Sequence, residues 1–343
     1  MTFRPLSTRG GPGRASSPVR RRAVAALAAV APLVLHAAPA VAQGGAYPSR
    51  PVRVVVPYPP GGPNDILARM LGARLGDGWN QPVVIDNRPG AGGNIGTVTV
   101  TRANPDGHTV VLHAMAVAVN PTLYGDAVPY KLSELAPVTL VARGPLVMTV
   151  HPSVPANSVK EFLALARARP GSINYGSGGN GSSLHLAGEL FKAQSGAAIT
   201  HIPYKGSADM INDLLGGRIS VVFASPLNAV PLARQGKLRM LAVTSARRAS
   251  ALPELPTLAE GGVPGYDMEA WFAVLAPAAT PRTIVAQLSK QIGAALRSPE
   301  VQERLAALGI EAAPTTPEQA AEYIQREAAR WDRILRTAGV KAD

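Results

Sequence analysis

The chain has 343 residues, with 34 Lys and Arg, 22 Asp and Glu, and no cysteine. A chain without cysteine has no disulfides, no thiolate metal sites and no lipid-anchored N-terminal cysteine. The basic residues form no clustered stripe of the kind that binds DNA or RNA, so we expect no nucleic-acid partner.

The first 42 residues are predicted to be a cleavable signal peptide. Arg20-Arg21-Arg22 precedes an alanine- and leucine-rich run, and Ala40-Val41-Ala42 offers the small-residue pattern of a cleavage site. This layout predicts export to the periplasm, by either the general or the twin-arginine pathway. The leader holds six of the arginines, so the mature chain carries 28 basic against 22 acidic residues, which suits an anionic ligand. No later stretch is long enough to span a membrane.

From Pro51 onward, short apolar runs alternate with amphipathic stretches, a pattern typical of α/β proteins with mostly parallel sheets. Strands are predicted at 51–56, 82–86, 109–113, 136–142, 146–150, 172–175, 199–202, 219–224, 239–244 and 269–275. A C-terminal helix is predicted from Thr316-Pro317-Glu318-Gln319, which offers a capping threonine, proline at the first helical position and glutamine at the third.

Two passages indicate two lobes. "LAPVTLVARGPLVMTVHP" and "WFAVLAP" are long apolar segments without a full helix between their halves. Such segments can cross between domains, which predicts lobe 1 at 46–145 plus 272–343 and an inserted lobe 2 at 146–271. The alternative is one continuous sheet.

The stretch "PYPPGGPND", 57–65, leads from a predicted strand through glycines into a helix. Pro63 suits the first helical position, so Gly62 is the cap and the amides of Asn64 and Asp65 are free at the helix start. Free amides at the positive end of a helix form an anion site. The loop lacks the Lys-Ser/Thr pair of a P-loop, so a carboxylate is the expected guest, although the turn can also be a mere connector and Asp65 a helix stabiliser.

A second loop, in "NYGSGGNGSSLHLAGELF" at 174–191, repeats this passage from strand to helix, with Ser182 or Ser183 as cap. Gly176, Gly178 and Gly181 spell G-x-G-x-x-G, but the following strand ends without the acid of a dinucleotide site. Two such loops, one per lobe, predict a cleft that holds a carboxylate between them.

These motifs resemble the Bug family, the extracytoplasmic solute receptors (TctC-like) of tripartite tricarboxylate transporters. The similarity covers 46–340 and includes "YPSRPVRVVVPYPPGGPNDILARML", "QPVVIDNRPGAGGNIGT", "HIPYKGSADMINDLLGGRI" and "LPTLAEGGVPGY". The resemblance implies a two-lobed periplasmic binding protein of the type II, Venus-flytrap kind. It also implies delivery of the ligand to a permease with one large and one small membrane subunit.

The candidate ligand-binding residues lie mainly in the two loops. They are Tyr58, Pro60, Gly61, Gly62, Asn64, Asp65, Met115, Ser177, Asn180, Gly181, Ser182, Ser183, Lys205 and Ala224. The family usually has threonine at position 64 and commonly aspartate at position 224. An aspartate at 224 would accept hydrogen bonds from a ligand ammonium group, so Ala224 predicts a carboxylate ligand without an amino group.

We expect a monomeric binding protein without enzymatic activity, cofactor or metal. The histidines His113, His151, His185 and His201 have no paired spacing with acids. A rival hypothesis is a secreted hydrolase that uses Ser182 or Ser183, but no G-x-S-x-G elbow is present. A second rival keeps the fold as the ligand-sensing input of a membrane kinase.

Overall fold

The structure is a computed structural model that describes residues 47–338. The predicted signal peptide, residues 1–42, lies outside this range. All ten predicted strands are confirmed, with ends that shift by at most three residues, and a two-residue strand, β11, was not predicted.

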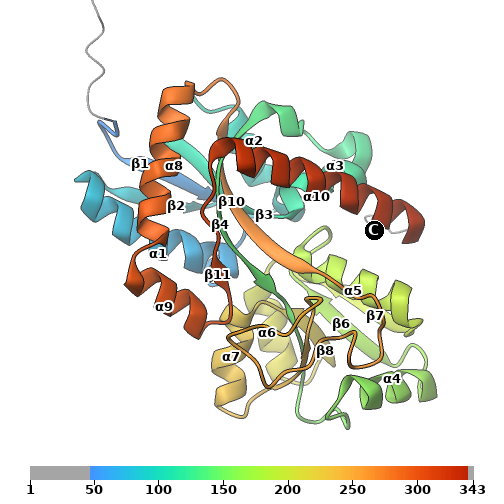
Figure 1. The fold of residues 1–343 in the computed structure, drawn as a ribbon. Coiled ribbons are helices and arrows are strands. Elements are labelled where there is room, and N and C mark those ends of the chain that lie inside the picture. The colour runs from blue at the N-terminus through green and yellow to red at the C-terminus, as the bar shows by residue number, and fades with distance from the viewer. Residues whose placement is uncertain (1–46, 339–343) are drawn as a thin grey trace, which may run out of the picture. The chain divides into compact units, whose positions relative to one another are not determined.

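The described residues fold into alternating strands and helices (Figure 1). The strands are β1 (Val52–Val56), β2 (Val83–Asn87), β3 (Thr109–Ala114), β4 (Leu135–Pro145), β5 (Val147–Val150), β6 (Ile173–Ser177), β7 (Ile199–Pro203), β8 (Val221–Ala224), β9 (Arg239–Val243), β10 (Glu269–Pro277) and β11 (Glu311–Ala312). The α-helices are α1 (Pro63–Trp79), α2 (Asn94–Thr101), α3 (Ala116–Tyr124), α4 (Val159–Ala168), α5 (Ser183–Ser195), α6 (Ser207–Leu215), α7 (Pro226–Arg234), α8 (Arg282–Leu296), α9 (Pro299–Ala307) and α10 (Pro317–Ala338). Short 3-10 helices are η1 (Ala91–Gly93), η2 (Gly125–Ala127) and η3 (Leu132–Glu134).

The strands form two sheets, so the alternative of one continuous sheet is wrong. The first sheet has the order β11-β4-β10-β3-β1-β2, and the second has the order β7-β6-β8-β5-β9. We call the first sheet with its helices lobe 1 and the second sheet with its helices lobe 2. Helices α8 and α10 pack on β4 in lobe 1, and α5 packs on β6 and β8 in lobe 2 (Figure 1).

The sheets are mixed, and this corrects the prediction of mostly parallel sheets. In lobe 1, β1 runs parallel to β2 and β3, but β10 runs antiparallel to β3 and β4. In lobe 2, β6 runs parallel to β7 and β8, but β5 runs antiparallel to β8 and β9. The antiparallel pairs thus involve β4, β5 and β10, the strands that lie next to the passages between the two sheets.

The chain passes from one sheet to the other at Leu146, the single residue between β4 and β5. Its amide donates to Thr244 Oγ1 at 2.7 Å, and the same hydroxyl donates to Met268 O at 2.8 Å on the returning segment. β10 lies wholly in the first sheet, so residues 269–271 pair there although the predicted boundary assigned them to lobe 2. The residue-level division into lobes stays a prediction.

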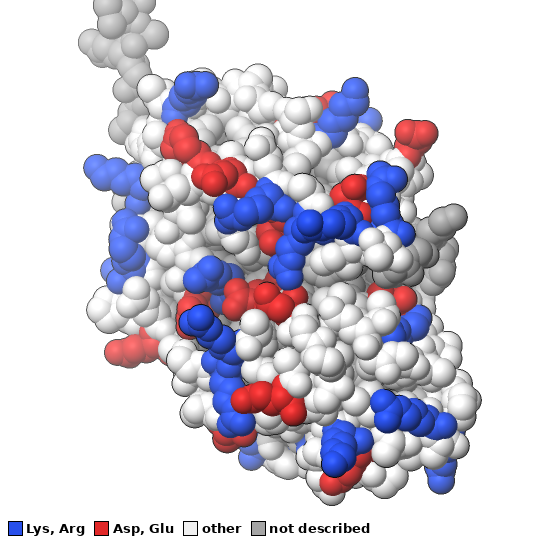
Figure 2. Space-filling model, turned by 45° about the vertical axis from the view of Figure 1, so that its right-hand side comes forward, with Lys and Arg blue, Asp and Glu red and all other residues white. Residues whose placement is uncertain are grey.

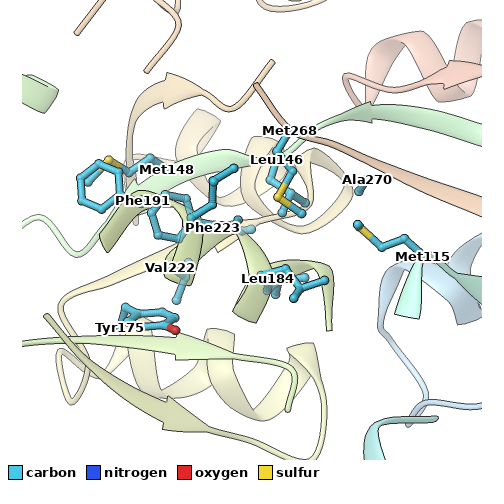
Figure 3. Packing of buried hydrophobic residues seen from close by; sticks show 14 of the residues in the cluster. Met115, Leu146, Met148, Tyr175, Leu184, Phe191, Val222, Phe223, Met268 and Ala270 are labelled. Atoms are coloured by element: carbon cyan, nitrogen blue, oxygen red, sulfur yellow. The ribbon is translucent and has the colours of Figure 1, made fainter. Parts of the chain in front are cut away.

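A continuous hydrophobic cluster fills lobe 2 and extends towards lobe 1. Phe191 of α5 and Phe223 of β8 lie 5.4 Å apart between ring centroids, and Figure 3 shows Leu146 and Met148 beside them, with Met115 of lobe 1 at the other end of the view. Met115 is fully buried in this cluster. One hydrophobic core therefore extends from lobe 2 past Leu146, the residue between the two sheets, to Met115 in lobe 1.

None of the described helices combines the length and apolar character that a membrane crossing requires.

Candidate functional site

Four helices begin around one cavity. β6, β7 and β8 run in parallel, so the loops that leave their carboxyl ends emerge at the same edge of the lobe 2 sheet. These loops lead into α5, α6 and α7, and in lobe 1 the loop after β1 leads into α1. The first-turn amides of a helix have no intrahelical partner and carry its positive partial charge. The arrangement therefore presents several positive helix ends to one small space.

The cavity between these helix starts has a volume of about 30 Å³, which is room for only a few water molecules. The described residues that line it come from both lobes, and none of them is an acid, a lysine or an arginine. The lining residues are Tyr58, Pro59, Gly62, Pro63, Asn64, Ala114, Leu146, Gly178, Ser182, Ser183, Leu184, Ser207, Ser225 and Phe272.

The first loop carries Gly62 as the residue that caps α1, with Pro63 at the first helical position, as predicted. Asn64 is buried, and its side-chain amide donates to Leu112 O at 3.2 Å on β3. That bond anchors α1 to the neighbouring strand, while Asn64 still lines the cavity. Asn64, which stands where the family usually has threonine, therefore makes a structural hydrogen bond to Leu112 O.

Asp65 is buried, and its carboxylate links the first loop to α1 and β2 through hydrogen bonds. Its carboxylate accepts hydrogen bonds from the Gly61 amide at 3.0 Å, Arg69 Nε at 2.9 Å and Asn87 Nδ2 at 3.0 Å. Burial raises the pKa of Asp65, but the hydrogen bonds from Arg69, Gly61 and Asn87 outweigh it and hold the pKa below its usual value. Asp65 is not among the residues that line the cavity.

In the second loop, Ser182 caps α5: its hydroxyl accepts a hydrogen bond from the His185 amide at 3.3 Å. Ser177 Oγ accepts the Gly179 amide at 3.1 Å and pairs with His201 Nε2 at 2.7 Å. The Asn180 carbonyl accepts from Tyr124 Oη of lobe 1 at 2.9 Å. These contacts hold the loop from both sides and leave Ser182 and Ser183 at the cavity.

The structure thus brings together five of the predicted site residues, namely Tyr58, Gly62, Asn64, Ser182 and Ser183. The other predicted residues do not line the cavity; they are Pro60, Gly61, Asp65, Met115, Ser177, Asn180, Gly181, Lys205 and Ala224. Ala224 is fully buried in the hydrophobic cluster, whereas Lys205 is exposed. Whether any of these residues contacts a ligand in another arrangement of the lobes stays a prediction.

Sequence reasoning missed Ser207 and Ser225, which both lie at the cavity. Each stands at a helix start directly after a strand and its loop, Ser207 after Gly206 and Ser225 before Pro226. A small polar residue followed by a helical pattern, repeated after β6, β7 and β8, was the signal that could have found them.

Two buried polar side chains, Tyr58 and His113, lie next to each other at the first loop. Tyr58 Oη and His113 Nε2 are buried without a hydrogen-bond partner among the described residues, and the two rings meet edge to face at 5.8 Å. Burial raises the pKa of Tyr58 far above its ordinary value, and burial lowers the pKa of His113 to about 4. Both groups are therefore neutral at pH 7, so the wall behind the loop adds no charge.

A larger hollow of about 430 Å³ lies elsewhere, around Arg143, Glu269 and α10. Its walls mix arginines with acids, among them Arg330, which pairs with Glu327 at 3.5 Å. Figure 2 likewise shows basic and acidic side chains interleaved over the face that it draws. We place the candidate site at the smaller cavity because helix starts from both lobes converge there. Among the described residues, no group of three or more His, Asp or Glu could hold a metal ion.

Comparison with known proteins identifies the family. The family model "Tripartite tricarboxylate transporter family receptor" matches residues 67–340. The chain belongs to this family of receptors. It is 40% identical to Protein BugT of Bordetella pertussis over 298 residues, which cover 86% of this chain and 91% of BugT. The predicted resemblance to the Bug family is thereby confirmed.

Solved structures of receptors with the same fold support this assignment. The structure of R. palustris Rpa4515 with adipate has a TM-score of 0.84 and 38% identity, over 86% of this chain and 99% of that one. The periplasmic binding protein BugD has a TM-score of 0.82 and 34% identity, over 86% and 99%. MatC from Rhodopseudomonas palustris with bound malate has a TM-score of 0.78 and 30% identity, over 84% and 100%. The chain has the two-lobed fold of periplasmic binding proteins.

Proposed function

We propose that this receptor captures a small carboxylate between its two lobes and delivers it to the membrane subunits of a tripartite tricarboxylate transporter. The observation that carries the proposal is the convergence of four helix starts on a cavity whose lining holds no acidic side chain. Helix N-termini stabilise anions through free amides and the helix dipole. Two similar structures hold carboxylates, Rpa4515 with adipate and MatC with bound malate, which supports the same class.

The ligand class follows from the lining. Serine hydroxyls and loop amides can donate hydrogen bonds to carboxylate oxygens, while Leu146, Leu184 and Phe272 offer apolar contact to the ligand body. A ligand ammonium would meet no carboxylate among these lining residues and would lose hydration on burial. We therefore propose a carboxylate without an amino group. This proposal rests on the cavity wall and not on Ala224, which is buried in the hydrophobic cluster and does not line the cavity.

Export and partners belong to the same proposal. The sequence pattern of residues 1–42 supports release into the periplasm by a cleavable signal peptide. We propose that the mature receptor is a monomer of two lobes, divided at Leu146 and directly before β10, that delivers its ligand to one large and one small permease subunit. We also propose that it performs no catalysis, because the matching family is one of receptors and the sequence has no G-x-S-x-G elbow around Ser182 or Ser183.

Isothermal titration calorimetry tests the ligand class with adipate, succinate and benzoate against aspartate and glutamate. Hydrogen bonds to charged groups are worth about 1.5–3 kcal/mol. Without a partner for the ammonium, we expect the amino acids to bind at least about tenfold more weakly than the best simple acid. Tightest binding of aspartate or glutamate would refute the proposed class, and conversion of the bound acid, followed by NMR, would refute the non-enzymatic role.

A further inference from the structure

The two cavity loops share one construction, although they belong to different lobes. Gly61 and Gly181 both have left-handed backbones, with φ of 82° and 79°. Each is followed by the residue that caps a helix, and each donates its amide to the side chain at the third helical position. Gly61 N donates to Asp65 Oδ2 at 3.0 Å, and Gly181 N donates to His185 Nδ1 at 3.3 Å.

Neither acceptor lines the cavity, and both are 3% exposed. Each is held in place from behind its loop. Asp65 accepts from Asn87 Nδ2, which also donates to Tyr58 O at 3.0 Å, so the strand end and the helix start are linked. The His185 ring lies 4.4 Å from the ring of His201, which pairs with Ser177 of the same loop.

We propose that Asp65 and His185 are paired positioning residues, which hold the backbone of the two loops, and with it the free helix-start amides, in the arrangement that binds the ligand, without touching the ligand themselves. This inference rests on the proposed function. A left-handed glycine without a fixed amide has more conformations to lose when a ligand arrives, and fixed donors avoid that cost. His185 accepts at Nδ1, so this ring nitrogen carries no proton in the arrangement that holds Gly181.

The chain contains a matched control away from the cavity. At the start of α4, Asn157 N donates to Glu161 Oε2 at 2.8 Å, so a third-position side chain accepts the same loop amide as in α1 and α5. Glu161 is exposed and lies outside the cavity lining. Its loss removes the same kind of helix-start contact without reaching the proposed site.

The experiment compares Asp65→Leu and His185→Leu, which lack the acceptor, with Asp65→Asn and His185→Asn, which keep an oxygen at the same position. Calorimetry with adipate measures affinity, and amide hydrogen exchange of the ligand-free protein measures the loops. We expect the Leu variants to lose about tenfold or more in affinity and to exchange faster at Gly61 or Gly181. The Asn variants should recover most of the adipate affinity and most of the protection from amide exchange. Glu161→Leu should leave the affinity unchanged.

Wild-type affinity in the Leu variants, or equal losses in the Leu and Asn variants, would overturn the inference. Asp65→Glu and His185→Gln, which displace the acceptor by about one bond, replace any Leu variant that does not fold and should weaken binding in the same direction. If the wild-type protein binds none of the acids, the proposed function fails. Exchange in the ligand-free protein still decides the positioning role: unchanged rates at Gly61 and Gly181 in the variants would reject it.

Discussion

Backbone amides and small hydroxyls, rather than charged side chains, form the polar part of the cavity wall. Ser182, Ser183, Ser207 and Ser225 lie there, and the lining contains neither Lys nor Arg. A wall of this kind recognises an anion through geometry, because neutral donors act only when they point at the ligand. Substitutions at this wall should therefore act by filling space or by moving the backbone.

Gly62→Val tests this expectation at the first loop. Gly62 has φ of −80°, and an added Cβ would meet only Pro59 O at 3.7 Å and Ser207 Oγ at 4.0 Å, so the backbone accepts a side chain. The valine methyl groups would occupy space between the helix starts. We expect a near-native melting temperature and loss of measurable acid binding by calorimetry.

Gly78→Val is the matched exchange, because Gly78 lies on the same helix with nothing within 4 Å of an added Cβ. It should bind like the wild type. Full affinity in Gly62→Val would show that the first loop only connects strand to helix.

We expect His113 to make the free energy of unfolding depend on pH. Burial outweighs the hydrogen bond to Ala114 O and lowers the pKa of His113 to about 4, against about 6.5 in the unfolded chain. Between these values the unfolded state binds the proton and the folded state does not. The free energy of unfolding therefore falls as the pH drops from 6.5 to 4, by up to roughly 3 kcal/mol at about 1.4 kcal/mol per unit.

His113→Asn removes this titration and can keep the contact that His113 Nδ1 makes with Ala114 O at 2.9 Å. Urea unfolding at pH 7, 5.5 and 4 should show a flatter pH dependence for the variant than for the wild type. Parallel curves for the two proteins would contradict the assigned role of His113.

At the scale of elements, the capping residues in the sequence predict where a helix begins. Thr316 and Gln319 form the predicted capping box of α10: Thr316 N donates to Gln319 Oε1 at 3.0 Å, and Gln319 N donates to Thr316 Oγ1 at 3.3 Å. α10 follows β11 in the chain and packs against α3 and β4.

Thr316→Ala should therefore lower the free energy of unfolding by about 1 kcal/mol, since one helix-start amide loses its acceptor. Urea unfolding monitored by circular dichroism measures this change. Ligand affinity should stay constant, because Thr316 lies outside the cavity lining. An unchanged unfolding midpoint would mean that water replaces the cap without cost.

At the scale of the whole molecule, contacts between the lobes close the cavity. Tyr124 Oη donates to Asn180 O at 2.9 Å, and Asn228 Nδ2 donates to Gly61 O at 3.3 Å, so each cavity loop is joined to the opposite lobe. A cavity of about 30 Å³ is too small for a dicarboxylate such as adipate. Under the proposed function, the lobes or their loops have to move to admit such a ligand, and these two bonds favour the closed arrangement.

Tyr124→Phe removes one bond between the lobes and should shift the ligand-free protein towards opening. One hydrogen bond contributes about 0.5–1.5 kcal/mol, so the dissociation constant should rise by up to about tenfold. Calorimetry measures that change, and small-angle X-ray scattering should show a larger radius of gyration without ligand. Tyr266→Phe is the control, since Tyr266 Oη donates to Ala187 O within lobe 2. Equal effects of the two exchanges would argue against a role in closure.

The sequence by itself determined the features that depend on neighbouring residues. Periodicity located the ten strands, proline and glycine located the start of α1, and Thr316 with Gln319 located the start of α10. Each signal lies within one turn or one strand, where the side chain and the backbone that it shapes are a few residues apart.

Only the tertiary structure decided which loop residues face the cavity. Asp65 turns away because Asn87 on β2 holds it, and Ser177 turns to His201 on β7, although both residues lie in the predicted loops. Ser207 and Ser225 reach the cavity because β6, β7 and β8 align their ends across the sheet. These outcomes depend on partners that are tens of residues apart in the chain and adjacent only after folding, so no local pattern in the sequence encodes them.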